Sequence, residues 1–295
     1  MKIAYYLDSG VRLWGELDLE ANTVRPFEGR FEQWAPAVTE AGRDGVSFAG
    51  GAISLDSVKL LAPVHETAEI LGTGVNYATH GLPRHGADVP FYMRPHSAIA
   101  NPGEDLVFPD IIKIQPRCRF SYELELCVVM GREVGDPDHG IRDVLGYAVG
   151  NDGRLVFQRP NFIGMDMTGS KCGYKGSSVG PWIVTKDEIS GDTQPDIEMT
   201  MRINGVITQQ ARTSAMNKDI SALIYELDDR IGLKAGDIIY TGTPGYIGID
   251  TGFYTPGDLI EAEIEGIGIL RNRMEHTNRD IGSNAAKSSH EVGWR

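Results

Sequence analysis

One stretch of the sequence places acidic side chains where a buried strand is expected. Residues 122–129 read YELELCVV. Because the side chains of a strand alternate between its two faces, Glu123 and Glu125 share a face that continues into Cys127 and Val129. The other face is apolar as well, which is typical of a strand covered on both sides. Two neighbouring carboxylates in such a place stay ionised only if a cation or several hydrogen-bond donors compensate their charge.

The local pattern leaves the compensating group open. A hard divalent ion bound through oxygen is the simplest compensator, and a solvated or arginine-paired face is the alternative. The chain contains a control, because residues 261–265 read EAEIE with the same spacing. There Ile260, Ala262 and Ile264 form one apolar face, so those glutamates belong to the wet side of a two-faced strand. The spacing of Glu123 and Glu125 alone therefore does not distinguish a metal site from a solvated or arginine-paired face.

Composition narrows the class of protein. A chain of 295 residues can bury a large core, either as one domain or as a main domain with a smaller one. The formal net charge of -13 argues against nucleic acid and anionic membranes as partners. No apolar run approaches the roughly 18 residues that a membrane-spanning helix needs.

The cysteines and the first residues indicate the compartment. Cys118, Cys127 and Cys172 are odd in number and lack C-x-x-C spacing, which favours neither a disulfide framework nor a structural zinc site. Asp8 lies where a signal peptide would stay apolar. We expect a cytoplasmic protein.

The periodicity predicts many strands and few helices. Residues 1–60 show short strands and turns, which we interpret as a small N-terminal β domain, followed by a main domain at 61–275 and a polar tail at 276–295. The best helix runs from Asp219 to Gly232, with Asn217 or Asp219 as its cap. Asn204-Gly205 predicts a hairpin turn.

A series of short motifs runs through most of the chain. Their sequences, in order, are GVNY at 74–77 followed by His80, RPHSA at 94–98, YELEL at 122–126, GY at 146–147 with Asn151-Asp152, GPWIV at 180–184, Asn204-Gly205, and GDII at 236–239 with TGTP at 241–244. In this order, from about Leu60 to Met274, they resemble the fumarylacetoacetate hydrolase family.

The resemblance implies a fold, a metal and a chemistry. The fold would be α+β and β-dominated, a mixed β-sheet roll with few helices, and usually a homodimer. Mg²⁺, Mn²⁺ or Ca²⁺ would bind an acidic triad, which by position is Glu123, Glu125 and Asp152. Family members act on 2-oxo and 1,3-diketo acids, and the metal serves as a Lewis acid that stabilises an enolate. Read locally, Asn151-Asp152-Gly153 favours a turn over a ligand site.

The resemblance also implies catalytic and substrate-binding residues. Lys171 and His80 match catalytic positions, and substrate contacts are expected from Tyr77, Arg94, Gln158 and Thr243. The alternative for Lys171 is a solvated loop lysine, of which Lys175 is a nearby example. Residues 78–90 have the composition either of a functional lid or of an ordinary surface loop.

The acid/base half of the pattern departs from the family. The family's hydrolases often read H-x-x-E, whereas Pro83 stands at the glutamate position, and Arg94 replaces the usual lysine.

We expect a divalent-metal-dependent enzyme that cleaves a C–C bond in an acylpyruvate or 1,3-diketo acid by hydrolysis. Isomerisation, decarboxylation or dehydration of a 2-oxo acid is the alternative. A non-catalytic binding or accessory homologue is the rival of another class.

Overall fold

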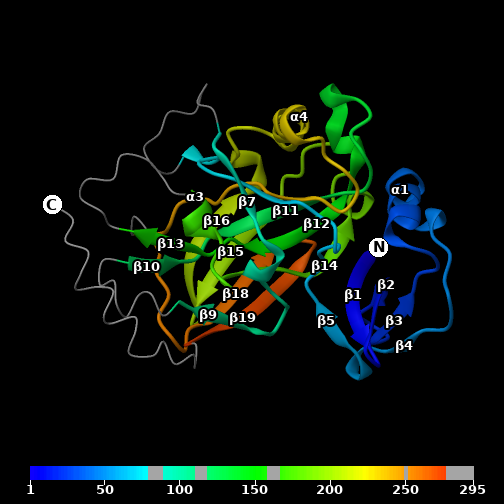
Figure 1. The fold of residues 1–295 in the computed structure, drawn as a ribbon, viewed down its shortest axis with the longest axis horizontal. Helices are drawn as coiled ribbons and strands as arrows, with labels where there is room; N and C mark the ends of the chain where they lie inside the picture. Colours follow the sequence, from blue (N-terminus) through cyan, green and yellow to red (C-terminus); the bar gives the residue numbers. More distant parts are fainter. Residues whose placement is uncertain (79–88, 110–117, 158–166, 249–251, 277–295) are drawn as a thin grey trace, which may run out of the picture.

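The structure is a computed structural model that describes residues 1–78, 89–109, 118–157, 167–248 and 252–276 (Figure 1). Its described part is dominated by strands in mixed sheets, with few helices, as predicted. The α-helices are α1 (Phe31–Ala41), α3 (Met167–Lys171) and α4 (Ile220–Ile231). Within the described residues no helix is long and apolar enough to cross a membrane.

The larger sheet has 12 strands. Their bounds are β1 (Lys2–Asp8), β2 (Val11–Asp18), β3 (Thr23–Pro26), β4 (Ile53–Ser54), β5 (Lys59–Leu61), β6 (Ile70–Thr73), β7 (Phe91–Arg94), β8 (Ile99–Ala100), β11 (Leu124–Met130), β12 (Val144–Asn151), β14 (Ser177–Thr185) and β17 (Ile238–Tyr240). The spatial order is β4-β3-β2-β1-β14-β12-β11-β17-β6-β7, with β5 beside β1 and β8 beside β14. Most neighbours are antiparallel, but β17–β6 and β14–β8 are parallel.

A second sheet and a two-stranded ribbon complete the strand content. The second sheet has the order β16-β15-β18-β19-β9. Its strands are β9 (Asp105–Phe108), β15 (Glu198–Ile203), β16 (Val206–Arg212), β18 (Leu259–Ile264) and β19 (Gly268–His276), and the ribbon pairs β10 (Cys118–Ser121) with β13 (Arg154–Phe157). Short 3₁₀ turns lie at Gly42–Gly45, Leu55–Ser57, His96–Ala98, Pro137–Asp143, Lys186–Glu188 and Thr213–Ala215.

Strand β11 is covered on both faces, as its sequence predicts. All seven of its residues are buried. Leu124, Leu126 and Val128 pack in the core shared with β15 and β18 of the second sheet. Cys127 and Val129 pack on the other side, in the cluster that includes residues of α1. Any polar side chain on this strand is therefore shielded from water.

The control strand β18 behaves as predicted. Ile260, Ala262 and Ile264 are buried, and the side chains between them are partly exposed. Glu261 pairs with Arg271 at 2.9 Å, and Glu263 pairs with Arg202 at 2.6 Å. The same E-x-E spacing is thus a surface feature on β18 and a buried one at β11.

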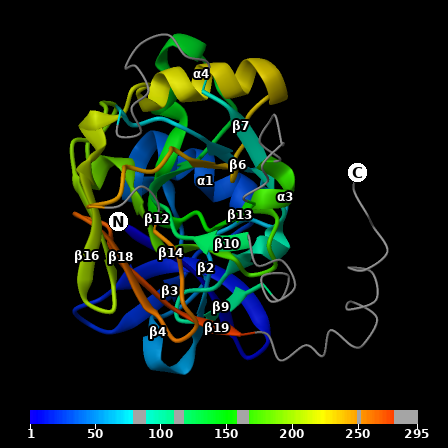
Figure 2. The ribbon, with the colours of Figure 1, turned by 90° about the vertical axis from the view of Figure 1, so that its left-hand side faces the viewer.

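The N-terminal strands join the large sheet directly. β1 pairs with β14, so that Lys2 lies opposite Val184 (blue and green in Figure 1). Figure 2 shows the same segment from the side, below α1. The division of the chain after residue 60 stays a prediction.

Helix α1 is a feature that the sequence interpretation missed. Residues 1–60 were predicted to form short strands and turns, and no helix was expected among them. The structure shows a helix whose Phe31, Trp34 and Val38 are buried, with the Gln33 side chain accepting a hydrogen bond from the Arg30 amide at 2.9 Å. Burial of this apolar stripe outweighs the single backbone hydrogen bond that Pro36 removes.

Two local predictions are confirmed. Asp219, not Asn217, caps α4, because its Oδ1 accepts a hydrogen bond from the Ala222 amide at 2.8 Å. Gly232 ends the helix with a φ of 66°. Asn204 and Gly205 link β15 to β16 with positive φ angles of 52° and 79°, as a tight hairpin turn requires.

Glu104 should contribute pH-dependent stability. Burial alone would raise its pKa, but hydrogen bonds from Lys59, Asn101 and Lys175 lower it from 4.5 to about 2. The contribution is complete above about pH 4.5 and is lost as the pH falls toward the folded-state pKa. We expect Glu104→Gln to lower the free energy of unfolding by about 1 kcal/mol at pH 7 and by much less at pH 3. Denaturant titrations check this, with Glu28→Gln as the exposed control; a deficit independent of pH would contradict it.

Candidate metal centre and active site

Three acidic side chains meet at one end of the β11–β12 pair. Antiparallel pairing places Leu124 opposite Asn151, so the start of β11 lies beside the end of β12. Glu123 directly precedes β11, Glu125 lies within it, and Asp152 directly follows β12. The Asp152 amide donates to the Glu123 carbonyl at 2.8 Å, which fixes the two chain ends together.

The triad is compact and buried. One carboxylate oxygen from each of Glu123, Glu125 and Asp152 lies within 4.8 Å of the others. The exposed fractions of the three residues are 5%, 1% and 0%. The alternative of a surface turn at Asn151-Asp152 is therefore wrong, because both residues are buried.

Buried cations surround the triad. Lys171, the last residue of α3, is 2% exposed, and its Nζ donates to Glu123 Oε2 at 2.5 Å and to an oxygen of Asp152. Arg94 pairs with Asp152, and Arg154 Nε lies 3.1 Å from Glu123 Oε1. The alternative of a solvated loop lysine is thus wrong for Lys171. Lys175 does not reach the triad: its side chain is partly exposed, and its Nζ pairs with Glu104 at 2.9 Å.

The carboxylates differ in how well they are compensated. Burial would raise the pKa of Asp152, but the charges of Arg94 and Lys171 outweigh it and lower that pKa to about 2. Burial and the nearby charge of Asp152 raise the pKa of Glu125 well above its ordinary value. Within the described residues, the hydrogen bond to Glu125 comes from the Gly242 amide, at 2.7 Å.

This donor set fits a hard divalent cation. The three side chains offer only oxygen ligands, and the least compensated of them, Glu125, is fully buried. Mg²⁺, Mn²⁺ and Ca²⁺ prefer such ligands. A cation there would add positive charge next to Glu125 and so stabilise its ionised form.

The loop 241–245 runs beside the triad. The Thr241 hydroxyl donates to the Leu126 carbonyl at 3.0 Å, which anchors the loop to β11. Gly242 has a φ of 99°, and a Cβ there would lie 2.7 Å from the Cβ of Asn76, so glycine is required for its amide to reach Glu125. Thr243 follows directly, which places this predicted substrate residue beside the metal centre.

The segment 74–77 lies against the same loop. The Asn76 side chain donates to the carbonyls of Thr241 at 2.9 Å and Lys218 at 3.0 Å. Val75 has a φ of 60°, a strained conformation for a β-branched residue. Tyr77 is 1% exposed, and its hydroxyl has no hydrogen-bond partner among the described residues. Burial and the charge of Glu125 raise the pKa of Tyr77.

The sequence-predicted residues fall into three groups. Those that the structure brings together at the triad are Glu123, Glu125, Asp152, Lys171 and Arg94. Tyr77 and Thr243 lie in the two segments next to it. His80 and Gln158 lie outside the described residues. Arg94 is buried and contacts Asp152 and the Lys171 and Gly153 carbonyls, so its substrate contact stays a prediction.

Three site residues were missed from the sequence. Tyr92 donates its hydroxyl hydrogen to Asp152, and a Cβ at Gly72 would lie 2.1 Å from the Tyr92 ring. Arg154 pairs with Glu123 across the turn that follows β12. Gln209 comes from the second sheet, 85 residues beyond Leu124, whose amide it binds. Tyr92 lies on β7, two residues before the motif that begins at Arg94, but nothing local marks Gln209.

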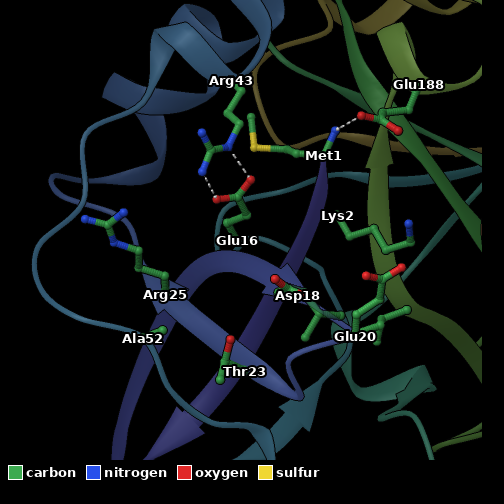
Figure 3. A pocket seen from close by; sticks show the side chains of 12 residues that line it. Met1, Lys2, Glu16, Asp18, Glu20, Thr23, Arg25, Arg43, Ala52 and Glu188 are labelled. Atoms are coloured by element: carbon green, nitrogen blue, oxygen red, sulfur yellow. Dashed lines mark hydrogen bonds and ion pairs between the residues drawn. The ribbon is translucent and has the colours of Figure 1, made fainter.

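A hollow elsewhere in the described structure lacks a buried carboxylate triad. It has a volume of about 470 Å³ and is lined by residues of β1–β3 and by Arg43 and Glu188 (Figure 3). Its Arg43 is already bound to Glu16 through two hydrogen bonds of 2.6 and 2.8 Å. Cations and acids are mixed on its walls, so it favours no ligand charge.

The structure thus has a mixed-sheet fold with a buried triad of carboxylates, the features that the motif order predicted. Comparison with known proteins identifies the family. A model of the fumarylacetoacetate (FAA) hydrolase C-terminal domain matches residues 69–275. The chain therefore belongs to the fumarylacetoacetate hydrolase family, which confirms the resemblance found in its motifs.

Relatives in the family carry different names. The chain is 33% identical over 231 residues to protein Rv2993c of Mycobacterium tuberculosis, covering 77% of this chain and 82% of that protein. It is 28% identical over 235 residues to maleylpyruvate hydrolase of Aquipseudomonas alcaligenes, covering 74% and 76%. The crystal structure of 5-carboxymethyl-2-hydroxymuconate delta-isomerase from Mycobacterium smegmatis superposes with a TM-score of 0.74 at 26% identity, over 94% of this chain and 100% of that one.

Lys171 should stabilise the metal-free protein far more than Lys175 does. Lys171→Met leaves the buried Glu123 and Asp152 without their shared ammonium, and breaking such a pair costs about 3 kcal/mol or more. Lys175→Met removes only the partly exposed pair with Glu104, worth about 1 kcal/mol or less. Denaturant unfolding in the presence of a chelator measures both losses. Equal losses would show that Lys171 does not neutralise the triad.

Proposed function

We propose that this protein is a divalent-metal-dependent enzyme that hydrolyses a C–C bond in an acylpyruvate or another 1,3-diketo acid by enolate chemistry. The observation that carries the proposal is the buried triad of Glu123, Glu125 and Asp152, whose least compensated member is Glu125. The similarity to a maleylpyruvate hydrolase supports an acylpyruvate as the substrate.

The triad would hold the cation, with water or substrate oxygens completing its coordination. We propose Mg²⁺ or Mn²⁺, and Ca²⁺ suits the same ligands. When bound, such an ion supplies Lewis acidity toward the oxygens of a 2-oxo acid.

The protein's own groups bind the substrate and move protons. The Thr243 hydroxyl, beside the triad, holds the substrate carboxylate. The Lys171 ammonium lies at the metal ligands, where it can stabilise an oxyanion or donate a proton. His80 transfers a proton to or from the substrate. With Pro83 at the family's glutamate position, no carboxylate at that position fixes its tautomer.

The same geometry supports a second reaction class. Isomerisation, decarboxylation or dehydration of a 2-oxo acid needs an enolate but no attacking water. Pro83 favours this class, and the structural similarity to an isomerase agrees with it. A non-catalytic homologue is disfavoured, because three buried carboxylates in one place are costly to keep without a use.

The proposal includes the setting of the enzyme. We propose a cytoplasmic homodimer that acts on a small carboxylic acid, without nucleic-acid or membrane partners, since its net charge of -13 repels both. We also propose an N-terminal β domain at 1–60 and a catalytic domain at 61–275.

Glu125 should be required for metal binding. We expect Glu125→Gln to weaken Mg²⁺ or Mn²⁺ binding at least about tenfold in calorimetric titrations, since it removes one of the three anionic ligands. Glu263→Gln is the matched control, because Glu263 has the same sequence spacing but lies on the partly exposed face of β18. Wild-type affinity in Glu125→Gln would place the metal elsewhere.

The balance between the two reaction classes can be measured directly. An acylpyruvate is incubated with the Mg²⁺-loaded protein in deuterated water, and NMR follows both C–C cleavage and hydrogen exchange at C3. We expect exchange to outpace cleavage, because water attack lacks the usual His–carboxylate base. Cleavage that keeps pace with exchange and is abolished by Asp88→Asn would instead show that another carboxylate has replaced the glutamate. Absence of both reactions would support the non-catalytic rival.

A further inference from the structure

Gln209 connects the second sheet to both halves of the active site. It lies on β16, is 0% exposed, and uses both ends of its amide. Its Oε1 accepts a hydrogen bond from the amide of Leu124, the residue between the two glutamate ligands, at 2.9 Å. Its Nε2 donates to the Pro244 carbonyl at 2.7 Å and to the Thr243 hydroxyl oxygen at 2.9 Å.

The backbone partners fix the orientation of this amide. The Leu124 amide can only donate and the Pro244 carbonyl can only accept. A flipped Gln209 would set two donors against each other at Leu124 and two acceptors against each other at Pro244. The Nε2 group must therefore face Thr243.

This orientation determines what the Thr243 hydroxyl can do. Since its oxygen accepts a hydrogen bond from Gln209, its hydrogen is free to be donated. The other contact that the structure gives it is the Pro244 carbonyl at 3.4 Å, which is long for an O–H donor. That carbonyl is already bound by Gln209 at 2.7 Å. The hydroxyl is thus prepared as a donor, which is the polarity that a carboxylate ligand needs.

We propose that Gln209 is a positioning residue that makes Thr243 a hydrogen-bond donor to the carboxylate of a 2-oxo acid substrate. The inference rests on the proposed function, because it takes Thr243 as the carboxylate contact. It adds that Gln209, a side chain of the second sheet, determines how strongly Thr243 binds the substrate carboxylate. Gln209 itself does not touch the substrate.

Gln209→Glu tests the proposal by reversing the polarity of the amide nitrogen. The new carboxylate still accepts from Leu124, but it draws the Thr243 hydrogen toward itself. We expect the Kd of pyruvate for the Mg²⁺-loaded protein to rise about tenfold or more, the scale of one hydrogen bond to a charged group. The KM of an acylpyruvate should rise with it, while kcat changes less. Gln210→Glu on the exposed side of the same strand is the matched control.

A double-mutant cycle with Thr243→Val separates positioning from a general effect of charge. Without the hydroxyl, Gln209→Glu should change the Kd of pyruvate by less than about twofold. An undiminished effect in that background would overturn the proposal. Gln209→Met removes the donor without adding charge and leaves the Pro244 carbonyl to attract the Thr243 hydrogen. It should also weaken pyruvate binding, so it serves if Gln209→Glu fails to fold.

The outcomes distinguish this inference from the proposed function. If Thr243→Val weakens pyruvate binding but Gln209→Glu and Gln209→Met do not, the inference alone fails. If the wild-type protein binds no pyruvate with Mg²⁺, or if Thr243→Val binds it normally, the carboxylate contact of the proposed function fails and the inference fails with it.

Discussion

Three carboxylates buried at one end of the β11–β12 pair impose an electrostatic cost that the surrounding structure offsets. Removing charged groups from water is expensive, and placing like charges together adds repulsion. The pairing of β11 with β12 causes this arrangement, because it brings Glu123, Glu125 and Asp152 to the same end of the two strands. Much of the remaining site consists of groups that compensate this charge.

The compensation comes from segments far apart in the sequence. Arg94 lies on β7, Arg154 on β13 and Lys171 at the end of α3, and each pairs with a triad carboxylate. Arg94 also binds the Lys171 carbonyl, which ties α3 to β7. These pairs leave Glu125 as the least compensated of the three carboxylates, with its pKa raised well above the ordinary value. The two sheets then meet through Gln209, which couples the loop at Thr243 to the backbone between the glutamates.

One family contains proteins named hydrolases and isomerases, because a shared fold can serve more than one reaction. The oxygen-ligand centre is suited to any reaction that passes through an enolate. Water attack additionally needs a positioned base, and the sequence at His80 and Pro83 departs from the family there. The fold thus follows from family membership, whereas the reaction depends on a few groups around the triad.

The sequence by itself determined the features that follow from local periodicity. The two-sided apolar pattern at 122–129 predicted a covered strand, the alternation at 259–264 predicted a half-exposed one, and the stripe at 220–231 predicted helix α4. The motif order also gave the family. Each of these depends on residues close together in the chain, whose side-chain directions are fixed by strand or helix geometry.

Only the tertiary structure decided the rest. Helix α1 forms despite Pro36, because its apolar stripe is buried against residues that are distant in sequence. The family resemblance selected Lys171 over Lys175, but its burial against the triad depends on how α3 packs. Gln209 and Gln210 are adjacent and chemically identical, yet strand pairing directs one toward the active site and the other toward solvent. Such choices depend on register and packing between distant segments, and a local pattern contains no information about either.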